Sequence, residues 1–181
     1  MRDNPPRERS KEDAMQRGHQ DHRPNPERHD RMIQEHNHDP YKRREKMADP
    51  AICPTCGAVY EDGRWRWGLL PTAATPIVCQ ACERIADHCP AGVVTLTGRY
   101  AAEHGQELLA LVRHQEEQEK AEHPLNRIME IRSIADGFEV TTTDIHLPRR
   151  IGEALRRTRH GDLTLHYDKG ECFARVRWHA D

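Results

Sequence analysis

Four cysteines in two closely spaced pairs carry the clearest chemistry in this sequence. Each pair has the form Cys-x-x-Cys, and 22 residues separate the two pairs, which are Cys53, Cys56, Cys79 and Cys82. Thiolates at this spacing can surround one tetrahedral Zn²⁺. Because four sulfur ligands leave no open coordination position, we expect one structural zinc ion and not a catalytic one.

The residues between and after the pairs predict the fold that holds this ion. A two-residue hairpin turn at Asp62-Gly63 sets Tyr60 opposite Trp65. Residues 82–88 have helical character and stop before a proline. A Cys-x-x-Cys turn, called a zinc knuckle, followed by a hairpin and then a helix is the element order of a treble-clef zinc finger. A zinc ribbon, with a third strand in place of the helix, is the alternative.

Composition limits the partners and the compartment. The chain has 181 residues, of which 35% are apolar and 32% charged, and its formal net charge is −2. Nucleic-acid binding would therefore depend on local basic patches. No apolar run could span a bilayer, and Met1-Arg2-Asp3-Asn4 does not begin a secretory signal. We expect a cytoplasmic protein that makes no membrane contact and keeps its thiols reduced.

The changes in composition predict an α+β protein in four segments. Residues 1–47 contain almost nothing apolar and are expected to form a disordered charged arm. Residues 48–98 form the four-cysteine zinc-finger domain, 99–123 a linking helix and 124–181 a small ββαββ domain. Within the arm, Tyr41 to Lys46 is the most basic stretch. It is a candidate phosphate contact or simply a solvated charge run.

The linking helix changes character along its length. Leu108, Leu111 and Val112 give its first half one apolar stripe, whereas Gln115 to Glu122 is polar on every side and acidic. We expect this second half to project into solvent or to bind a protein partner.

The last segment reads as two hairpins and a helix, forming one sheet covered by one helix. Its turns are expected at Asp136-Gly137 and Lys169-Gly170. The helix between the hairpins buries a stripe of apolar residues, with Thr143 or Asp144 as its cap and Pro148 in its first turn. The stripe comprises Leu147, Ile151, Ala154, Leu155 and Thr158.

The opposite face of that helix carries four arginines that form a candidate RNA-binding stripe. They are Arg149, Arg150, Arg156 and Arg157. Arginine suits phosphate oxygens because its guanidinium is a planar fork of donors. Arg159 would extend the stripe, as would His166, Arg175 and Arg177 of the final hairpin. Because Glu153 interrupts it, a merely soluble surface is the alternative.

Arg64 and Arg66 of the zinc hairpin form a second candidate RNA contact. They alternate with Trp65 and Trp67, and aromatics interleaved with arginines can stack bases and hold phosphates. We expect both tryptophans to pack under the hairpin, which leaves the two arginines outside.

The sequence lacks the motifs of common enzymes. It has no phosphate-cradling glycine loop, no nucleophile elbow and no His-Glu-x-x-His. We therefore expect no enzymatic activity and no small-molecule substrate.

Two further blocks complete a resemblance to known families. With the cysteine pairs, Glu122-His123-Pro124-Leu125 and residues 141–147 (Thr-Thr-Thr-Asp-Ile-His-Leu) resemble an uncharacterised bacterial zinc-finger family from about residue 39 to the end. More distantly, the cysteine pairs and element order resemble the amino-terminal half of the archaeal and eukaryotic adaptor family for large-ribosomal-subunit export. That family has two zinc sites, and this chain has cysteines for one. The resemblance implies a role on ribosomal RNA or the ribosome.

Together these features predict a zinc-stabilised, non-enzymatic RNA-binding adaptor with the ribosome as its expected partner. The alternative is a protein–protein interaction module or regulator that engages its partner through the linking helix. Salt separates the two, because phosphate contacts weaken steeply with salt and an apolar protein interface does not.

Overall fold

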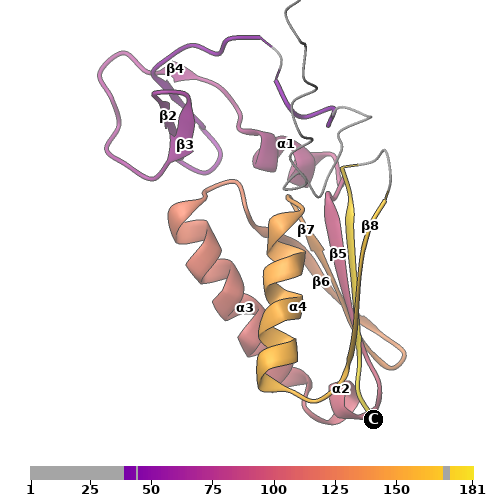
Figure 1. Ribbon diagram of the computed structural model, residues 1–181. Coiled ribbons are helices and arrows are strands. Elements are labelled where there is room, and N and C mark those ends of the chain that lie inside the picture. Colours follow the sequence, from indigo (N-terminus) through magenta and orange to yellow (C-terminus); the bar gives the residue numbers. More distant parts are fainter. Residues whose placement is uncertain (1–38, 44, 169–171) are drawn as a thin grey trace, which may run out of the picture. The chain divides into compact units, whose positions relative to one another are not determined.

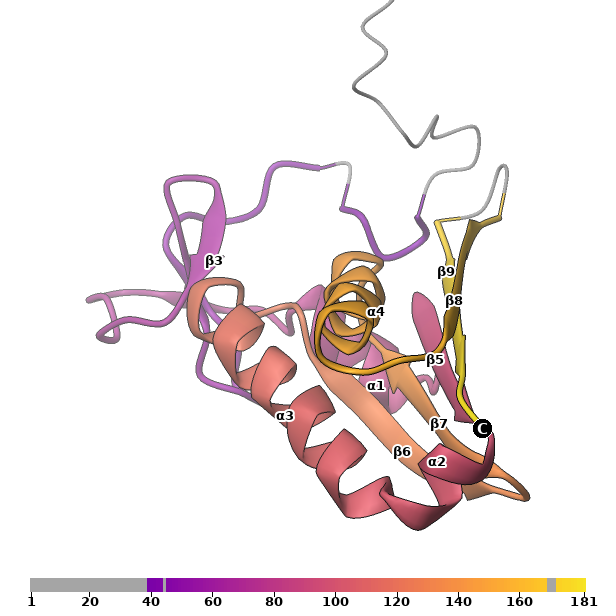
Figure 2. The same ribbon diagram turned by 60° about the horizontal axis from the view of Figure 1, so that its bottom comes forward.

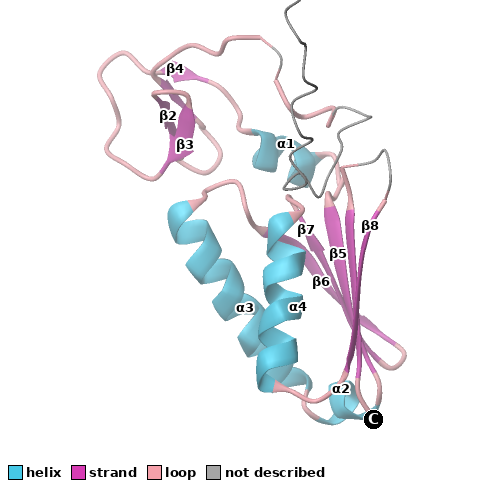
Figure 3. Cartoon of the chain, in the orientation of Figure 1, coloured by secondary structure: helices cyan, strands magenta, loops and turns pink. Residues whose placement is uncertain are grey.

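The computed structural model describes residues 39–43, 45–168 and 172–181 (Figure 1). All of them belong to one unit, Ile33–Asp181. The predicted arm up to residue 38 and the predicted turn at Lys169-Gly170 lie outside the described residues. The described chain is mixed α and β, as predicted (Figure 3).

A small sheet surrounds the cysteine pairs. Its strand order is β3-β2-β1-β4, with β1 at Ala51–Ile52, β2 at Val59–Glu61, β3 at Arg64–Arg66 and β4 at Thr75–Pro76. The predicted hairpin register is confirmed, since Tyr60 pairs with Trp65. Asp62 and Gly63 have φ angles of 52° and 77°, which the predicted two-residue turn requires. A helix, α1 (Gln80–Ala86), follows the second cysteine pair, as in the treble-clef alternative.

The larger sheet has five strands in the order β6-β7-β5-β9-β8. Its strands are β5 (Gly92–Thr97), β6 (Ile128–Ile134), β7 (Gly137–Thr142), β8 (Asp162–Tyr167) and β9 (Ala174–His179). The prediction of two hairpins alone was incomplete, because β5 lies between them. This strand pairs antiparallel with β7 and parallel with β9, so it joins the two hairpins into one sheet.

Two helices, not the predicted one, cover one face of this sheet. They are α3 (Gly105–Glu122) and α4 (His146–Thr158), which lie on the same side of the strands in Figure 2. A five-residue helix, α2 (Arg99–Glu103), precedes them. The core between the layers includes Leu96 and Trp178 from the sheet, Leu108 from α3 and Leu155 from α4. None of the described helices combines the length and apolarity needed to cross a bilayer.

The other face of the sheet is polar. In β9, Val176 and Trp178 are buried and alternate with the exposed Arg175 and Arg177. The two arginines, and His166 of β8, which pairs with Arg175, therefore point away from the helices. The expectation that these three residues of the final hairpin extend the arginine stripe of α4 was wrong, because the sheet lies between them and that stripe.

Helix α4 begins as predicted. Oδ2 of Asp144 accepts hydrogen bonds from the N–H groups of His146 and Leu147, at 2.6 and 3.0 Å. Pro148 lies in the first turn, where its missing N–H costs little. The predicted apolar stripe is buried except for Thr158, which is exposed.

The stretch just before the zinc module is attached to α1. Asp39 forms an ion pair with Arg84 at 2.5 Å, and the Tyr41 hydroxyl donates to Asp87 at 2.8 Å. Arg43 pairs with Glu83. Tyr41 and Arg43, expected to lie in a disordered arm or on phosphates, instead bind the surface of α1.

Loss of core packing between α4 and the sheet should destabilise the fold. Leu155→Ala should lower the free energy of unfolding by about 2–5 kcal/mol, because the side chain is fully buried. The neighbouring Arg156→Ala, at an exposed position, should change it by less than about 0.5 kcal/mol. Urea unfolding in excess zinc measures both. Equal effects would contradict this account of the core.

Candidate metal centre and the groove beside it

The four cysteine side chains converge as predicted. Their Sγ atoms all lie within 4.8 Å of one another, and those of Cys56 and Cys79 are 3.7 Å apart. A tetrahedral zinc ion with Zn–S bonds of about 2.3 Å separates its sulfur atoms by about 3.8 Å. The donor atoms and their spacing therefore fit one tetrahedral metal ion.

Two local turns place the sulfur atoms. In the first, the N–H of Cys53 donates to Ala58 O at 2.8 Å and that of Gly57 donates to Cys53 O at 2.9 Å. Gly57 has φ +77°, a conformation that residues with a Cβ rarely adopt. In the second, Cys79 precedes α1 and Cys82 lies in its first turn. The Cys79 N–H also donates to Cys53 Sγ at 3.4 Å, which joins the two turns.

Burial and backbone donors act in opposite directions on these thiols. Burial raises the pKa of Cys79 and that of Cys82. Burial also acts to raise the pKa of Cys53, but N–H donors, led by that of Cys79, outweigh it and lower this pKa to about 6. Cys53 therefore loses its proton more readily than Cys79 or Cys82. A metal ion must displace protons from Cys79 and Cys82 to bind.

A buried arginine that the sequence analysis missed completes the centre. Arg127 is only 8% exposed. Its Nη2 donates to Sγ of Cys56 and of Cys79, both at 3.3 Å, and its Nη1 donates to Sγ of Cys82 at 3.5 Å. Burial acts to lower the pKa of Arg127, but the cysteines outweigh it and raise this pKa. The guanidinium therefore stays charged and offsets part of the negative charge of the thiolates.

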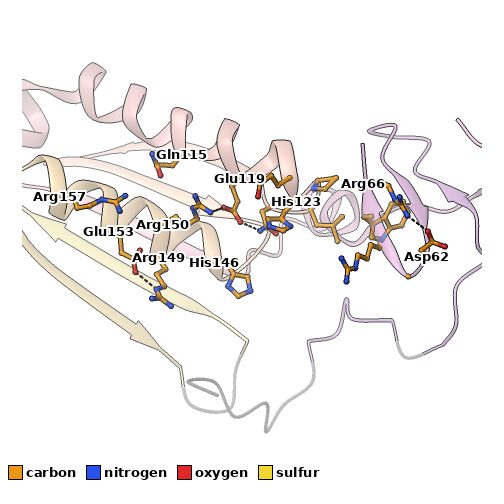
Figure 4. A pocket seen from close by; sticks show the side chains of 17 residues that line it. Asp62, Arg66, Gln115, Glu119, His123, His146, Arg149, Arg150, Glu153 and Arg157 are labelled. Carbon is orange, nitrogen blue, oxygen red and sulfur yellow. Dashed lines mark hydrogen bonds and ion pairs between the residues drawn. The ribbon is translucent and has the colours of Figure 1, made fainter. Parts of the chain in front are cut away.

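Beside the centre lies a groove of about 1310 Å³, lined by β3, the end of α3 and one side of α4 (Figure 4). Trp65 and Leu125 pack against the cysteine cluster and also line the groove. Five of the six arginines predicted to bind RNA lie along it, namely Arg64, Arg66, Arg149, Arg150 and Arg157. The sixth, Arg156, is exposed but does not line the groove. The two predicted contacts thus meet at one surface.

Acidic residues already pair with three of these arginines. Arg66 pairs with Asp62 at 3.0 Å, Arg149 with Glu153 at 2.7 Å and Arg150 with Glu119 at 2.5 Å. Within the described part of the chain, the guanidinium groups of Arg64 and Arg157 have no hydrogen bond or ion pair. These two cations of the groove are therefore available to an anionic ligand.

Glu119 shows that the second half of α3 is not the solvated spacer predicted. It is only 4% exposed, and besides Arg150 it accepts a hydrogen bond from Nδ2 of Asn126 at 3.0 Å. Glu116 accepts from the N–H of Ile128 at 2.8 Å. The spacing of Glu119 from Leu108 and Val112 places all three on one helical stripe, a signal that the sequence analysis did not use.

The two hairpin tryptophans differ. Trp65 packs against the cysteine cluster, as predicted, with its ring centroid 5.4 Å from that of Tyr60. The expectation that Trp67 packs beside it was wrong, because Trp67 is 37% exposed and its Nε1 donates to Lys120 O at 2.6 Å. This bond attaches the hairpin to the end of α3.

No family model, curated protein or solved structure matches this chain. Its function has to be inferred from the cysteine centre and the groove themselves.

Removal of one thiolate should remove the metal. The purified protein is expected to hold one zinc ion per chain, and Cys79→Ser is expected to hold almost none, because the buried hydroxyl is a poor ligand for zinc. Cys89→Ser is the matched control, since Cys89 lies outside the cluster. Inductively coupled plasma mass spectrometry measures both. Zinc retained in Cys79→Ser, or lost in Cys89→Ser, would contradict the assignment.

Removal of Arg150 should leave Glu119 as a buried, unpaired charge. Arg150→Ala should therefore lower the free energy of unfolding by about 1–3 kcal/mol. Arg149→Ala is the control, because both partners of its pair with Glu153 are largely exposed, and it should cost at most about 0.5 kcal/mol. Chemical unfolding at constant zinc concentration compares the two. A similar small cost for both would show that Glu119 does not depend on Arg150.

Proposed function

We propose that this chain is a zinc-stabilised, non-enzymatic adaptor that binds RNA in the cytoplasm, with the ribosome as its partner. The observation that carries the proposal is the meeting of Arg64 and Arg157 in one groove. Arg64 comes from β3 and Arg157 from α4, far apart in the sequence. Unpaired guanidinium groups gathered from separate elements suit a ligand with several phosphates.

The metal of this proposal is a single structural Zn²⁺ in a treble-clef finger. Four sulfur donors at tetrahedral spacing and a helix after the second knuckle support it. The ion would hold the β2–β3 hairpin in place beside α4. Four thiolates leave no open position for a substrate, which favours a binding role over an enzymatic one.

In this proposal the arginines have different roles, depending on whether an acidic residue already pairs with them. Arg66, Arg149 and Arg150 are held by acidic partners and keep the walls of the groove in place. Arg64 and Arg157 then contact phosphates inside the groove, and the exposed Arg156 contacts the ligand where it leaves α4. The proposed RNA contact is therefore narrower than the six residues predicted from the sequence.

The sequence blocks behind the family resemblance also support the proposal. Pro124 and Leu125 of the first block line the groove, and Thr143 and Asp144 of the second hold the start of β6 and of α4. The blocks thus cover the junction that shapes the groove. The ribosomal partner is implied by the more distant resemblance, which the cysteine pairs and the element order carry.

A protein partner is the second candidate, and one loop favours it. Leu69 and Leu70, between β3 and β4, are 95% and 67% exposed, and adjacent exposed leucines are typical of protein contacts. The surface first predicted for this role, Gln115 to Glu122, is less suitable because Glu116 and Glu119 already have partners within the chain.

Salt-dependent co-sedimentation with ribosomes tests the proposal. The zinc-loaded protein should sediment with ribosomes at low salt, and Arg64→Ser/Arg157→Ser should weaken this binding at every salt concentration. Loss of two phosphate contacts should also reduce the slope of log K against log salt by about 1.4–1.8. The slope falls because the RNA releases fewer counterions when two arginines no longer contact its phosphates.

Arg177→Ser is the matched control, because Arg177 is exposed on the opposite face of the sheet. It should bind as the unchanged protein does. Absence of the protein from the ribosome fraction at every salt concentration would refute the ribosomal proposal. Binding that is insensitive to salt and is lost in Leu69→Ser/Leu70→Ser would instead favour the protein partner.

A further inference from the structure

Arg127 lies where the cysteine centre meets the larger sheet. It directly precedes β6, yet its guanidinium donates to three of the four thiols at 3.3–3.5 Å. Its Nε donates to Pro124 O at 2.6 Å. These contacts use four of the five N–H groups of the guanidinium, and thiols accept three of them.

Charge makes this contact depend on the metal. Four thiolates around a divalent cation carry a net charge of about −2, which a buried guanidinium neutralises in part. A bound metal ion would hold the four Sγ atoms at fixed positions, and three of these atoms are the acceptors of the Arg127 guanidinium. Without the ion, only the two local turns keep the sulfur atoms together, and a buried cation with poorly fixed acceptors is costly. The site therefore holds Arg127 most firmly when the metal is bound.

The backbone around Arg127 carries this effect towards the groove. Its N–H donates to Oγ1 of Thr143 at 2.9 Å, and its carbonyl accepts from the N–H of Thr143 at 2.9 Å. Thr143 also donates to Leu125 O at 2.6 Å. Leu125 lines the groove, and Thr143 directly precedes Asp144, the cap of α4. Hydrogen bonds at Arg127 and Thr143, together with the chain bond from Thr143 to Asp144, thus connect the thiols with the start of the helix that carries Arg157.

We propose that Arg127 is a positioning residue that couples metal occupancy of the cysteine centre to the geometry of the groove. Zinc binding fixes Arg127, and Arg127 fixes residues 124–126 and the first turn of α4. Because coupling between two sites is reciprocal, a ligand in the groove would in turn tighten zinc binding. The inference rests on the proposed zinc site, and only its last consequence rests on the proposed RNA function.

Zinc affinity and amide hydrogen exchange test the coupling without any RNA. In Arg127→Met, the affinity for zinc, measured by competition with a chromophoric chelator, should fall about 10–100-fold, as is typical when a group that supports metal ligands is lost. Arg132→Met is the matched control, because Arg132 is an exposed arginine of β6 that pairs with Glu139. It should leave the affinity unchanged.

Amide hydrogen exchange shows which parts of the protein respond to the loss of zinc. In the unchanged protein, removal of zinc should speed exchange at least about 10-fold at the N–H groups of Ile128 and Leu147, which Glu116 and Asp144 hold. The N–H groups of β5 and β9 in the sheet centre should stay protected and serve as the internal reference. In Arg127→Met, the N–H groups of Ile128 and Leu147 should exchange fast even with zinc bound.

Three results would overturn the coupling. One is unchanged zinc affinity in Arg127→Met. Another is an equal change in amide hydrogen exchange on removal of zinc in Arg127→Met and in the unchanged protein. The third, which needs no variant, is exchange at Ile128 and Leu147 that ignores zinc in the unchanged protein. If these measurements agree with the coupling but no RNA binds, the RNA proposal fails and the role of Arg127 stands.

Discussion

The structure depends on one buried electrostatic contact, between the guanidinium of Arg127 and the thiols of the cysteine cluster. Each side supports the other, because thiolates gathered around a metal ion would repel one another and a buried cation requires acceptors with negative charge. The contact brings the start of β6 to a centre formed by residues 53–82. It therefore determines how the small sheet and the larger sheet meet, and the groove with Arg64 and Arg157 lies at that junction.

Features set by neighbouring residues were predictable from the sequence. The cysteine spacing predicted the cluster, and Asp62-Gly63 predicted the register of Tyr60 and Trp65, because a two-residue turn allows few pairings. The buried stripe and cap of α4 followed from helical periodicity in the same way. In each case the interacting residues lie within a few positions of each other or share a metal-binding motif.

Features set by distant residues were not predictable. The strand β5 reads equally well as an appendage of the finger, and only its pairing with both β7 and β9 shows that it is the centre of the larger sheet. Arg127 and Glu119 look like ordinary polar residues, since their partners come from other segments. The arginines of β9 were wrongly expected to continue the stripe of α4 for a similar reason, because alternation gives a face but not the position of the helices.

The central claim is that RNA binds in the groove between β3 and α4. Ultraviolet cross-linking of the zinc-loaded protein to ribosomes, followed by mass spectrometry of the linked peptides, tests it most directly. The account predicts links in the peptides that contain Trp65 and His146, two photoreactive residues that line the groove. Links confined to the polar face of the larger sheet, around Arg175 and Arg177, would contradict it.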